Sequence, residues 1–208
     1  MASTPNSALT RIKVRRSAPS DGPAHHHPES SAVTIRNLDH LLSPRSIALI
    51  GASDRVGSVG AVLTRNLGKG GFAGDIWLIN PRRREVNGVA CHPDVASLPG
   101  VPELAVIATS PETVPGLIEQ LGSKGCRAAV VITAGIHGAV KQAMLEAAGR
   151  YLLRIQGPNC LGLMLPRLGV DATFSHVMPP AGTLAFLSQS GALITGIVDW
   201  AASRGVGF

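Results

Sequence analysis

The chain has 208 residues, 45% of them hydrophobic and 3% aromatic, with a formal net charge of +6. This length allows one full domain and part of a second. The three cysteines, Cys91, Cys126 and Cys160, are widely spaced, which argues against a disulfide framework or metal site and for a reducing compartment, the cytoplasm. No apolar run reaches the ~18 residues of a membrane span, and no basic helix with interleaved aromatics indicates nucleic-acid binding.

Residues 1–36 are polar and rich in Ser and Pro, and we expect them to form a disordered basic tail. They hold half of the excess charge, because five basic and two acidic side chains give a net charge of +3. Three adjacent histidines lie here, and we interpret them as solvated rather than metal-binding: His25, His26 and His27.

From residue 37 the sequence alternates between buried strands and helices. We expect strands over 46–50, 76–79, 104–108, 128–132 and 152–155, and helices over 59–67, 112–121 and 140–149. This alternation predicts the α/β class, with a Rossmann-like, doubly wound parallel sheet over residues 37–165. The alternation of strands and helices begins again after residue 166. A strand over 182–187 and a helix to about Arg204 predict the start of a second domain, 166–208, so we expect the chain to be truncated or half of a pair.

A glycine-rich turn follows the first strand and leads into the first long helix. It contains Gly51, Ser53, Gly57, Ser58 and Gly60. Glycine lets the backbone approach a phosphate, and the free N–H groups at a helix start attract an anion. The alternative is a tight turn without a ligand.

The end of the second strand discriminates between nucleotides. NAD sites usually place Asp or Glu there, whereas this chain has Asn80, followed after Pro81 by Arg82, Arg83 and Arg84. The missing acid and the three cations disfavour NAD and favour a ligand with a phosphate on its ribose, either NADP or coenzyme A. A solvated basic loop is the alternative.

Two later loops also carry polar groups. Gly157–Gly162 forms a stiff turn that contains Asn159, and we interpret Cys160 beside it as a small buried thiol, because no paired histidine is evident. Ser188 and Ser190 precede the last helix. Their hydroxyls and the free N–H groups there would cradle a phosphate, or simply cap the helix.

Together these motifs resemble NDP-forming (ADP-forming) acyl-CoA synthetases, relatives of the succinyl-CoA synthetase alpha subunit. The similarity covers about residues 38–208, and six stretches carry it: LSPRSIALIGAS (42–53), GSVG (57–60), INP (79–81), VITAG (131–135), GPNCLG (157–162) and LSQSGA (187–192). It is closest to the synthetase-like module of Pat-type protein lysine acetyltransferases, where the module is joined to a GNAT domain. Residues 65–72, 121–126 and 199–200 carry that similarity.

The resemblance implies a CoA-binding domain followed by a flavodoxin-like, succinyl-CoA-ligase-like domain. It implies that CoA or acetyl-CoA binds with its nucleotide at residues 53–60 and 80–83, its pantetheine arm along Thr109 and Thr133, and its thiol near Asn159. Ser188 and Ser190 would hold phosphate near a phosphohistidine. The implied partners are the remaining ligase domain, an ATP-grasp domain and a GNAT domain, on the same chain or on a separate one.

Two departures from the family weaken the case for synthetase chemistry. No histidine stands in the context of the phosphohistidine, and the loop after the fourth strand reads Ile136-His137-Gly138-Ala139, where active members usually carry Glu. We interpret His137 as a surface histidine. We therefore expect a regulatory CoA- or acyl-CoA-binding module without catalytic residues of its own. The alternatives are the CoA-binding half of an active ADP-forming acetyl-CoA synthetase and, less favoured, an NADP-dependent oxidoreductase.

Overall fold

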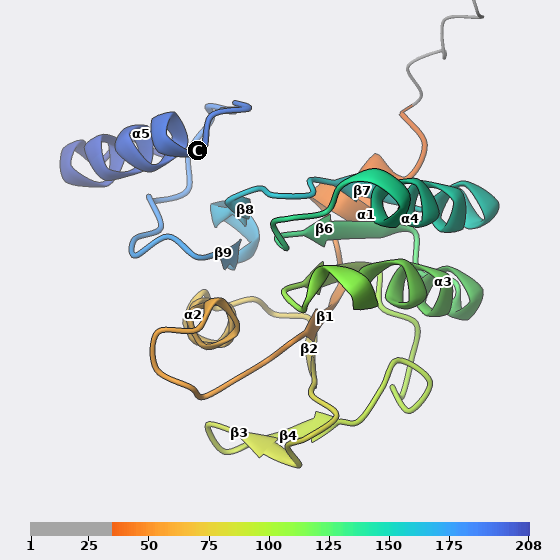
Figure 1. Cartoon of the computed structure of the whole chain (residues 1–208). Coiled ribbons are helices and arrows are strands. Elements are labelled where there is room, and N and C mark those ends of the chain that lie inside the picture. The colour runs from red at the N-terminus through yellow and green to blue at the C-terminus, as the bar shows by residue number, and fades with distance from the viewer. Residues whose placement is uncertain (1–34) are drawn as a thin grey trace, which may run out of the picture. The chain divides into compact units, whose positions relative to one another are not determined.

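A seven-stranded sheet organises residues 35–208, the part of the chain that the computed structural model describes (Figure 1). All neighbouring strands are parallel except the pair β3–β4 at one edge. The order is β3 (Glu85–Val86), β4 (Val89–His92), β2 (Asp75–Ile79), β1 (Ser46–Ile50), β5 (Leu104–Ile107), β6 (Ala128–Val131) and β7 (Arg154–Gln156). The predicted tail and its three histidines lie outside the described residues, except for Ile35 and Arg36.

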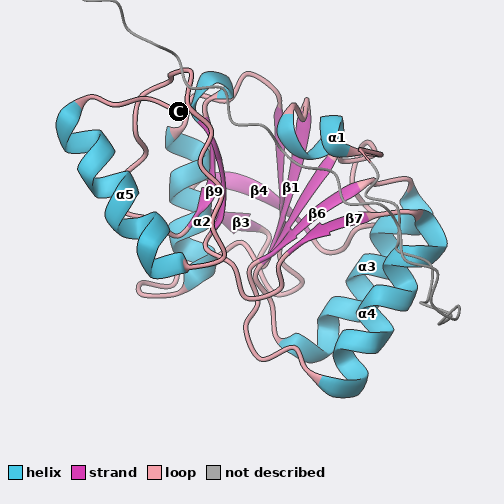
Figure 2. Cartoon of the chain, turned by 90° about the horizontal axis from the view of Figure 1, so that it is seen from above, coloured by secondary structure: helices cyan, strands magenta, loops and turns pink. Residues whose placement is uncertain are grey.

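The winding direction of the sheet reverses between β1 and β5, as in doubly wound folds. Helices α3 (Val114–Lys124) and α4 (Gly138–Tyr151) cover one face (Figure 2). The other face is covered by α1 (Leu38–Leu42), α2 (Val59–Lys69) and the hairpin of β8 (Gly162–Leu165) and β9 (Val170–Thr173). The predicted α/β class and doubly wound parallel sheet are confirmed.

Strand β1 shows why both faces are covered. Ala48 and Ile50 belong to the core under α3 and α4, whereas Ile47 and Leu49 belong to the core under α2. All four side chains are buried. Because successive residues of a strand point to opposite faces, a continuous apolar run is typical of a strand buried on both sides.

The structure contains two hairpins that were not predicted, β3–β4 and β8–β9. The first turns at Asn87 and Gly88, which both have positive φ angles of 51° and 81°. An Asn-Gly pair is the sequence signal for such a two-residue turn. Short 3-10 helices, η1 (Pro111–Thr113) and η2 (Pro166–Leu168), precede α3 and β9.

The strand predicted over residues 182–187 is not formed, whereas the helix after it is present as α5 (Gly191–Arg204). A strand needs a neighbouring strand for its backbone hydrogen bonds. Within residues 35–208 this segment pairs only at its start, where Gly182 N–H donates to the Phe208 carbonyl and Phe208 N–H donates to the Pro180 carbonyl. The strand prediction was therefore wrong, because it relied on the apolar run alone. No helix of the described residues has the length and apolar character to cross a membrane.

Candidate functional site

The carboxyl ends of β5, β6 and β7 meet along one edge of the sheet, and a cavity of about 720 Å³ opens there. This volume is in the range of small-molecule sites. Its wall is formed by Val59 at the start of α2, by the loops after β5, β6 and β7, by Phe174 after β9, and by the first turns of α5. The cavity therefore lies next to the point where the sheet reverses its winding.

The structure brings together three of the predicted site residues, Thr109, Thr133 and Asn159, in the wall of this cavity. Thr133 Oγ1 donates to the Thr109 carbonyl at 2.9 Å, and Asn159 N–H donates to the Thr133 carbonyl at 3.0 Å. These bonds fix three loops to one another. The Asn159 side chain is exposed and has no hydrogen bond to any described residue, so its amide is available to a ligand.

Gly51 and Gly60 are required by close packing of the backbone. Gly51 has a φ of 96°, and a Cβ there would lie 2.5 Å from the Ala108 carbonyl oxygen. A Cβ at Gly60 would collide with the carbonyl oxygen of Gly51. Gly57 is different, because its φ is 79° but the space around it is open. Gly57 therefore leaves the backbone before α2 uncovered.

The hydroxyls of Ser53 and Ser58 shape this same turn. Ser58 is the N-cap of α2, where its Oγ accepts from Ala61 N–H at 3.2 Å and donates to the Arg55 carbonyl at 2.7 Å. Ser53 Oγ accepts from Arg55 N–H at 3.0 Å. Capping of this kind stabilises a helix start by about 1 kcal/mol. These contacts hold the turn in place whether or not a ligand is bound.

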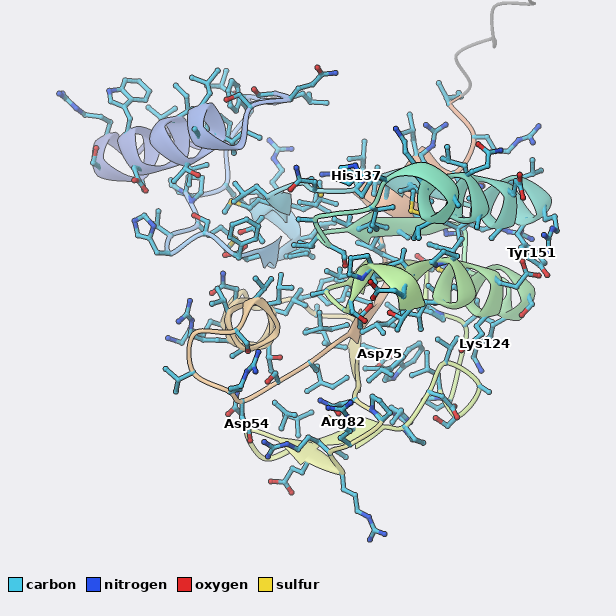
Figure 3. The ribbon with its side chains drawn as sticks, viewed as in Figure 1. Asp54, Asp75, Arg82, Lys124, His137 and Tyr151 are labelled. Carbon is cyan, nitrogen blue, oxygen red and sulfur yellow. The ribbon has the colours of Figure 1, made fainter. Side chains whose placement is uncertain are left out.

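Asn80 joins the loop after β2 to the loop after β1. Its Nδ2 donates to the Ala52 carbonyl at 2.7 Å, and its Oδ1 accepts from Arg82 N–H at 2.8 Å. Arg83 Nη1 lies 3.2 Å from Asp54 Oδ2. The Arg82 side chain is exposed and makes no hydrogen bond or ion pair within residues 35–208, and the same is true of Arg84. Arg82 is therefore a free cation next to the ion-paired Arg83. Figure 3 shows Asp54 and Arg82 on these two loops.

The thiol of Cys160 lies in the cavity wall, half-buried, with Sγ 3.4 Å from the Val131 carbonyl. Burial raises its pKa, so the neutral thiol is favoured and nucleophilic reactivity is low. None of the described histidines lines the cavity. His137 is exposed at the N-cap of α4, as predicted for a surface histidine (Figure 3).

Ser188 and Ser190 stand at the start of α5. Ser188 Oγ accepts from Ser190 N–H at 3.0 Å, and Ser190 Oγ accepts from Leu193 N–H at 3.3 Å. Ser190 is therefore an ordinary helix cap, while both hydroxyl protons stay available for a second acceptor. Within residues 35–208, no group of three or more His, Cys, Asp or Glu side chains is placed to hold a metal ion.

Sequence reasoning missed Asp54 and the apolar part of the cavity wall, which includes Val59, Leu161 and Phe174. Asp54 carried a signal, because an acid in a phosphate-type turn needs a cation, and arginines follow the next strand. The apolar wall had no such signal in the sequence, since its members are far apart along the chain and meet only through the tertiary fold.

Comparison with known proteins identifies the family of this chain. Residues 45–166 match the family model of the CoA binding domain. The chain is 40% identical over 177 residues to the ADP-forming acetate–CoA ligase I of Archaeoglobus fulgidus, covering 82% of this chain and 26% of that protein. It is 37% identical over 177 residues to the alpha subunit of the ADP-forming acetate–CoA ligase II of Pyrococcus furiosus, and this match covers 82% of this chain and 38% of that subunit.

A solved structure of a related synthetase has a similar fold over this region. The dinucleotide-forming acetyl-coenzyme A synthetase 1 of Ca. Korarchaeum cryptofilum, solved with phosphate and ADP, superposes with a TM-score of 0.75 and 34% identity. The match covers 82% of this chain and 38% of that one. The chain thus spans well under half the length of these relatives. On this evidence it belongs to the CoA-binding domain family and is homologous to the corresponding region of ADP-forming acyl-CoA synthetases.

Proposed function

We propose that the chain binds coenzyme A or acyl-CoA along the carboxyl edge of its sheet. The observation that carries the proposal is the order of features on that edge: a free cation at Arg82, an uncovered glycine turn at Gly57, and a cavity of about 720 Å³ over β5–β7. Coenzyme A has the matching parts in the same order, namely a ribose phosphate, a pyrophosphate and an uncharged pantetheine arm that ends in a thiol.

The proposed roles follow from this alignment. Arg82 and Arg83 pair with the ribose phosphate, because guanidinium groups bind phosphate oxygens in a bidentate manner. The N–H groups between Gly57 and the start of α2 receive the pyrophosphate. Thr109, Thr133 and Asn159 flank the pantetheine arm. Ser53, Ser58 and Asn80, like Gly51 and Gly60, hold the loops in the geometry that the nucleotide requires.

The proposed role of the bound CoA is regulatory, as the CoA-sensing module of a Pat-type acetyltransferase. Two features support this: no described histidine lines the cavity, and the loop 136–139 has no acid. A second candidate, the CoA-binding part of an active ADP-forming synthetase, is favoured by relatives that are named as acetate–CoA ligases. A coupled assay for ADP release with acetate, ATP and CoA separates them when the remaining ligase and ATP-grasp domains of a related synthetase are supplied. We expect no turnover that depends on this chain, and such turnover would overturn the regulatory assignment.

Residues 166–208, whose strand β9 still packs on the first sheet, are proposed to lead into a second, ligase-like domain that further protein covers. Several large apolar side chains of this region are exposed: Leu184, Phe186, Leu187, Leu193 and Trp200. Partners that would cover them are the remaining ligase domain, an ATP-grasp domain or a GNAT domain. Ser188 and Ser190 would hold a phosphate at the start of α5. The three free cysteines suit a reducing compartment such as the cytoplasm.

Calorimetric titration with CoA, acetyl-CoA, NADP and NAD tests the binding proposal. We expect CoA and acetyl-CoA to bind, NADP to bind more weakly, and NAD not to bind, because no carboxylate follows β2 to hold ribose hydroxyls. Tighter binding of NADP than of CoA would contradict the proposal and favour the oxidoreductase alternative.

A further inference from the structure

A second hollow, of about 720 Å³, lies at the amino edge of the sheet, opposite the edge of the proposed CoA site. We call it the amino-edge hollow. Its wall is formed by residues at or just before the amino ends of β1, β2 and β5, and by the loop 99–101 that leads into β5. The length of the strands separates it from the loops that follow them, so it is a separate feature of the molecule.

The aromatic side of this hollow is held in place by the surrounding structure. Trp77 on β2 packs against the core under α3 and α4. The loop before β5 lies against its ring, because a Cβ at Gly100 would lie 3.0 Å from Trp77 Cη2. Lys124 at the end of α3 holds that loop, since its Nζ donates to the carbonyls of Ala96 and Leu98 at 3.0 and 3.1 Å (Figure 3). The hollow therefore has a preformed wall that includes an indole ring.

Among the described residues, two acids and one cation line the amino-edge hollow, and only one of the acids is neutralised. Arg45 donates to the Glu103 carboxylate from its backbone N–H at 2.9 Å and from Nε at 2.8 Å, and its Nη2 adds a third bond. The Asp75 carboxylate is exposed and makes no hydrogen bond or ion pair with any residue of 35–208. The wall therefore presents one uncompensated negative charge, at Asp75.

The free carboxylate and the indole lie on the same side of the sheet. Asp75 and Trp77 are two residues apart on β2 and both line the hollow, as expected because alternate side chains of a strand share a face. A ligand that contacts the indole can therefore place a positive charge at Asp75. A Ca²⁺ ion takes about six to eight oxygen ligands, whereas a single free carboxylate beside an aromatic ring suits an ammonium group on an apolar body.

We propose that the amino-edge hollow binds a small organic amine, with its ammonium group paired to Asp75 and its apolar body against Trp77. The ammonium donates charge-assisted hydrogen bonds to the carboxylate, and the body buries apolar surface of the indole and of the loop 99–101. The proposal is independent of the proposed function, because none of the residues that line this hollow lines the cavity over β5–β7. A failure of CoA binding would leave it standing.

Calorimetry and tryptophan fluorescence with three matched compounds test this proposal. The chain has two tryptophans, Trp77 and Trp200, so Trp200→Phe leaves Trp77 as the only reporter. We expect phenethylamine to change the emission of Trp77 in a saturable way. Phenethyl alcohol and 3-phenylpropionate carry the same ring with a neutral or a negative group, and they should bind at least about tenfold more weakly. Equal affinities for the three compounds, or no calorimetric binding of the amine, would overturn the proposal.

A fourth compound separates a free amine from a basic side chain of a partner protein. N-acetyl-lysine methylamide presents the same ammonium group on an aliphatic stem, as a lysine side chain does. We expect it to bind more weakly than phenethylamine, because the shorter apolar body leaves the indole partly uncovered. Tighter binding of the blocked lysine would overturn the assignment to a small amine.

Two substitutions that change the charge of the wall in opposite directions place the ligand. Asp75→Asn keeps the shape of the side chain and is expected to weaken phenethylamine binding about tenfold, leaving phenethyl alcohol unchanged. Arg45→Gln removes the charge that neutralises Glu103 and should strengthen phenethylamine binding by about threefold or more. Asp39→Asn is the matched control, because Asp39 is an exposed acid of α1 that does not line the hollow. Equal losses of affinity in Asp75→Asn and Asp39→Asn would overturn the proposed site.

Discussion

Arg83 and Asp54 form an ion pair that joins the loop after β2 to the loop after β1, with 3.2 Å between Arg83 Nη1 and Asp54 Oδ2. Both side chains are partly exposed, so the pair itself contributes little to stability, about 0 to 1 kcal/mol. Its effect is geometric, because it holds Arg83 toward the glycine turn. Arg82 next to it keeps its guanidinium free.

This division of roles predicts that CoA binds more tightly than dephospho-CoA and that Arg82 accounts for most of the difference. Arg82→Ala is expected to weaken CoA binding roughly tenfold to a hundredfold, the effect of losing a charge-assisted hydrogen bond of about 1.5–3 kcal/mol. It should leave dephospho-CoA binding unchanged. Calorimetry on the two ligands measures both effects.

Arg204→Ala is the matched control for Arg82→Ala, because it removes an exposed cation at the far end of α5. It should leave both affinities as they are. Equal affinities of the unaltered protein for CoA and dephospho-CoA would show that the basic loop does not contact the ribose phosphate.

The two glycines of the turn after β1 are expected to respond differently to substitution. From sequence alone, Gly51→Val would abolish CoA binding and leave the fold largely intact. The structure changes this expectation, since the Cβ would lie 2.5 Å from the Ala108 carbonyl oxygen. Gly51→Val should therefore lower the free energy of unfolding by about 2 kcal/mol or more, from strain and overpacking.

Gly57→Ala is the comparison variant for Gly51→Val. The φ of Gly57 is also positive, but no atom lies within reach of the added Cβ. We therefore expect the free energy of unfolding to fall by about 1 kcal/mol, from backbone strain alone. Urea denaturation of both variants measures the difference. A Gly51→Val variant that is as stable as Gly57→Ala would contradict the packing described between β1 and β5.

The sheet could be predicted from sequence because its signals are local. Strands β1, β5 and β6 are short apolar runs, and the first of them is ended by Gly51. The failed strand at 182–187 has the same local signal, but its formation depends on a neighbouring strand. The site divides in the same way: Arg82 and Asn159 are visible as short motifs, whereas Val59 and Phe174 meet only after folding.

Asn80→Asp tests whether the end of β2 decides the nucleotide. The substitution removes the amide that donates to the Ala52 carbonyl at 2.7 Å and puts a carboxylate beside that oxygen. We expect the free energy of unfolding to fall by about 1–3 kcal/mol. CoA binding should weaken as well, because the two loops separate and the new charge repels phosphate. Asn80→Ser keeps a hydroxyl donor and should therefore lose less stability and less CoA affinity. Unchanged CoA affinity in Asn80→Asp would remove this loop from the site.

The last prediction concerns pH and the buried thiol of Cys126. This side chain is fully buried in the connection between α3 and β6, with Sγ 3.3 Å from the Ala128 carbonyl, and burial raises its pKa from 9.0 to about 11. The folded state therefore keeps the proton more tightly than the unfolded state does. The neutral thiol therefore contributes to the free energy of unfolding. This contribution is fully present below about pH 9 and is lost as the pH rises through about 11, because between these values only the unfolded chain ionises.

Two pKa units correspond to about 2–3 kcal/mol of free energy of unfolding. Other groups titrate in the same range, so the quantity to measure is the stability difference between the unaltered protein and Cys126→Ala. At pH 7 the variant should be less stable by about 1 kcal/mol, since it loses buried volume. As the pH rises from 8 toward 10.5, we expect this gap to close and then to reverse in favour of the variant. Cys91→Ala, at a partly exposed thiol with a smaller rise in pKa, should show a weaker trend. A gap for Cys126→Ala that stays constant with pH would mean that the thiol is not held neutral by burial.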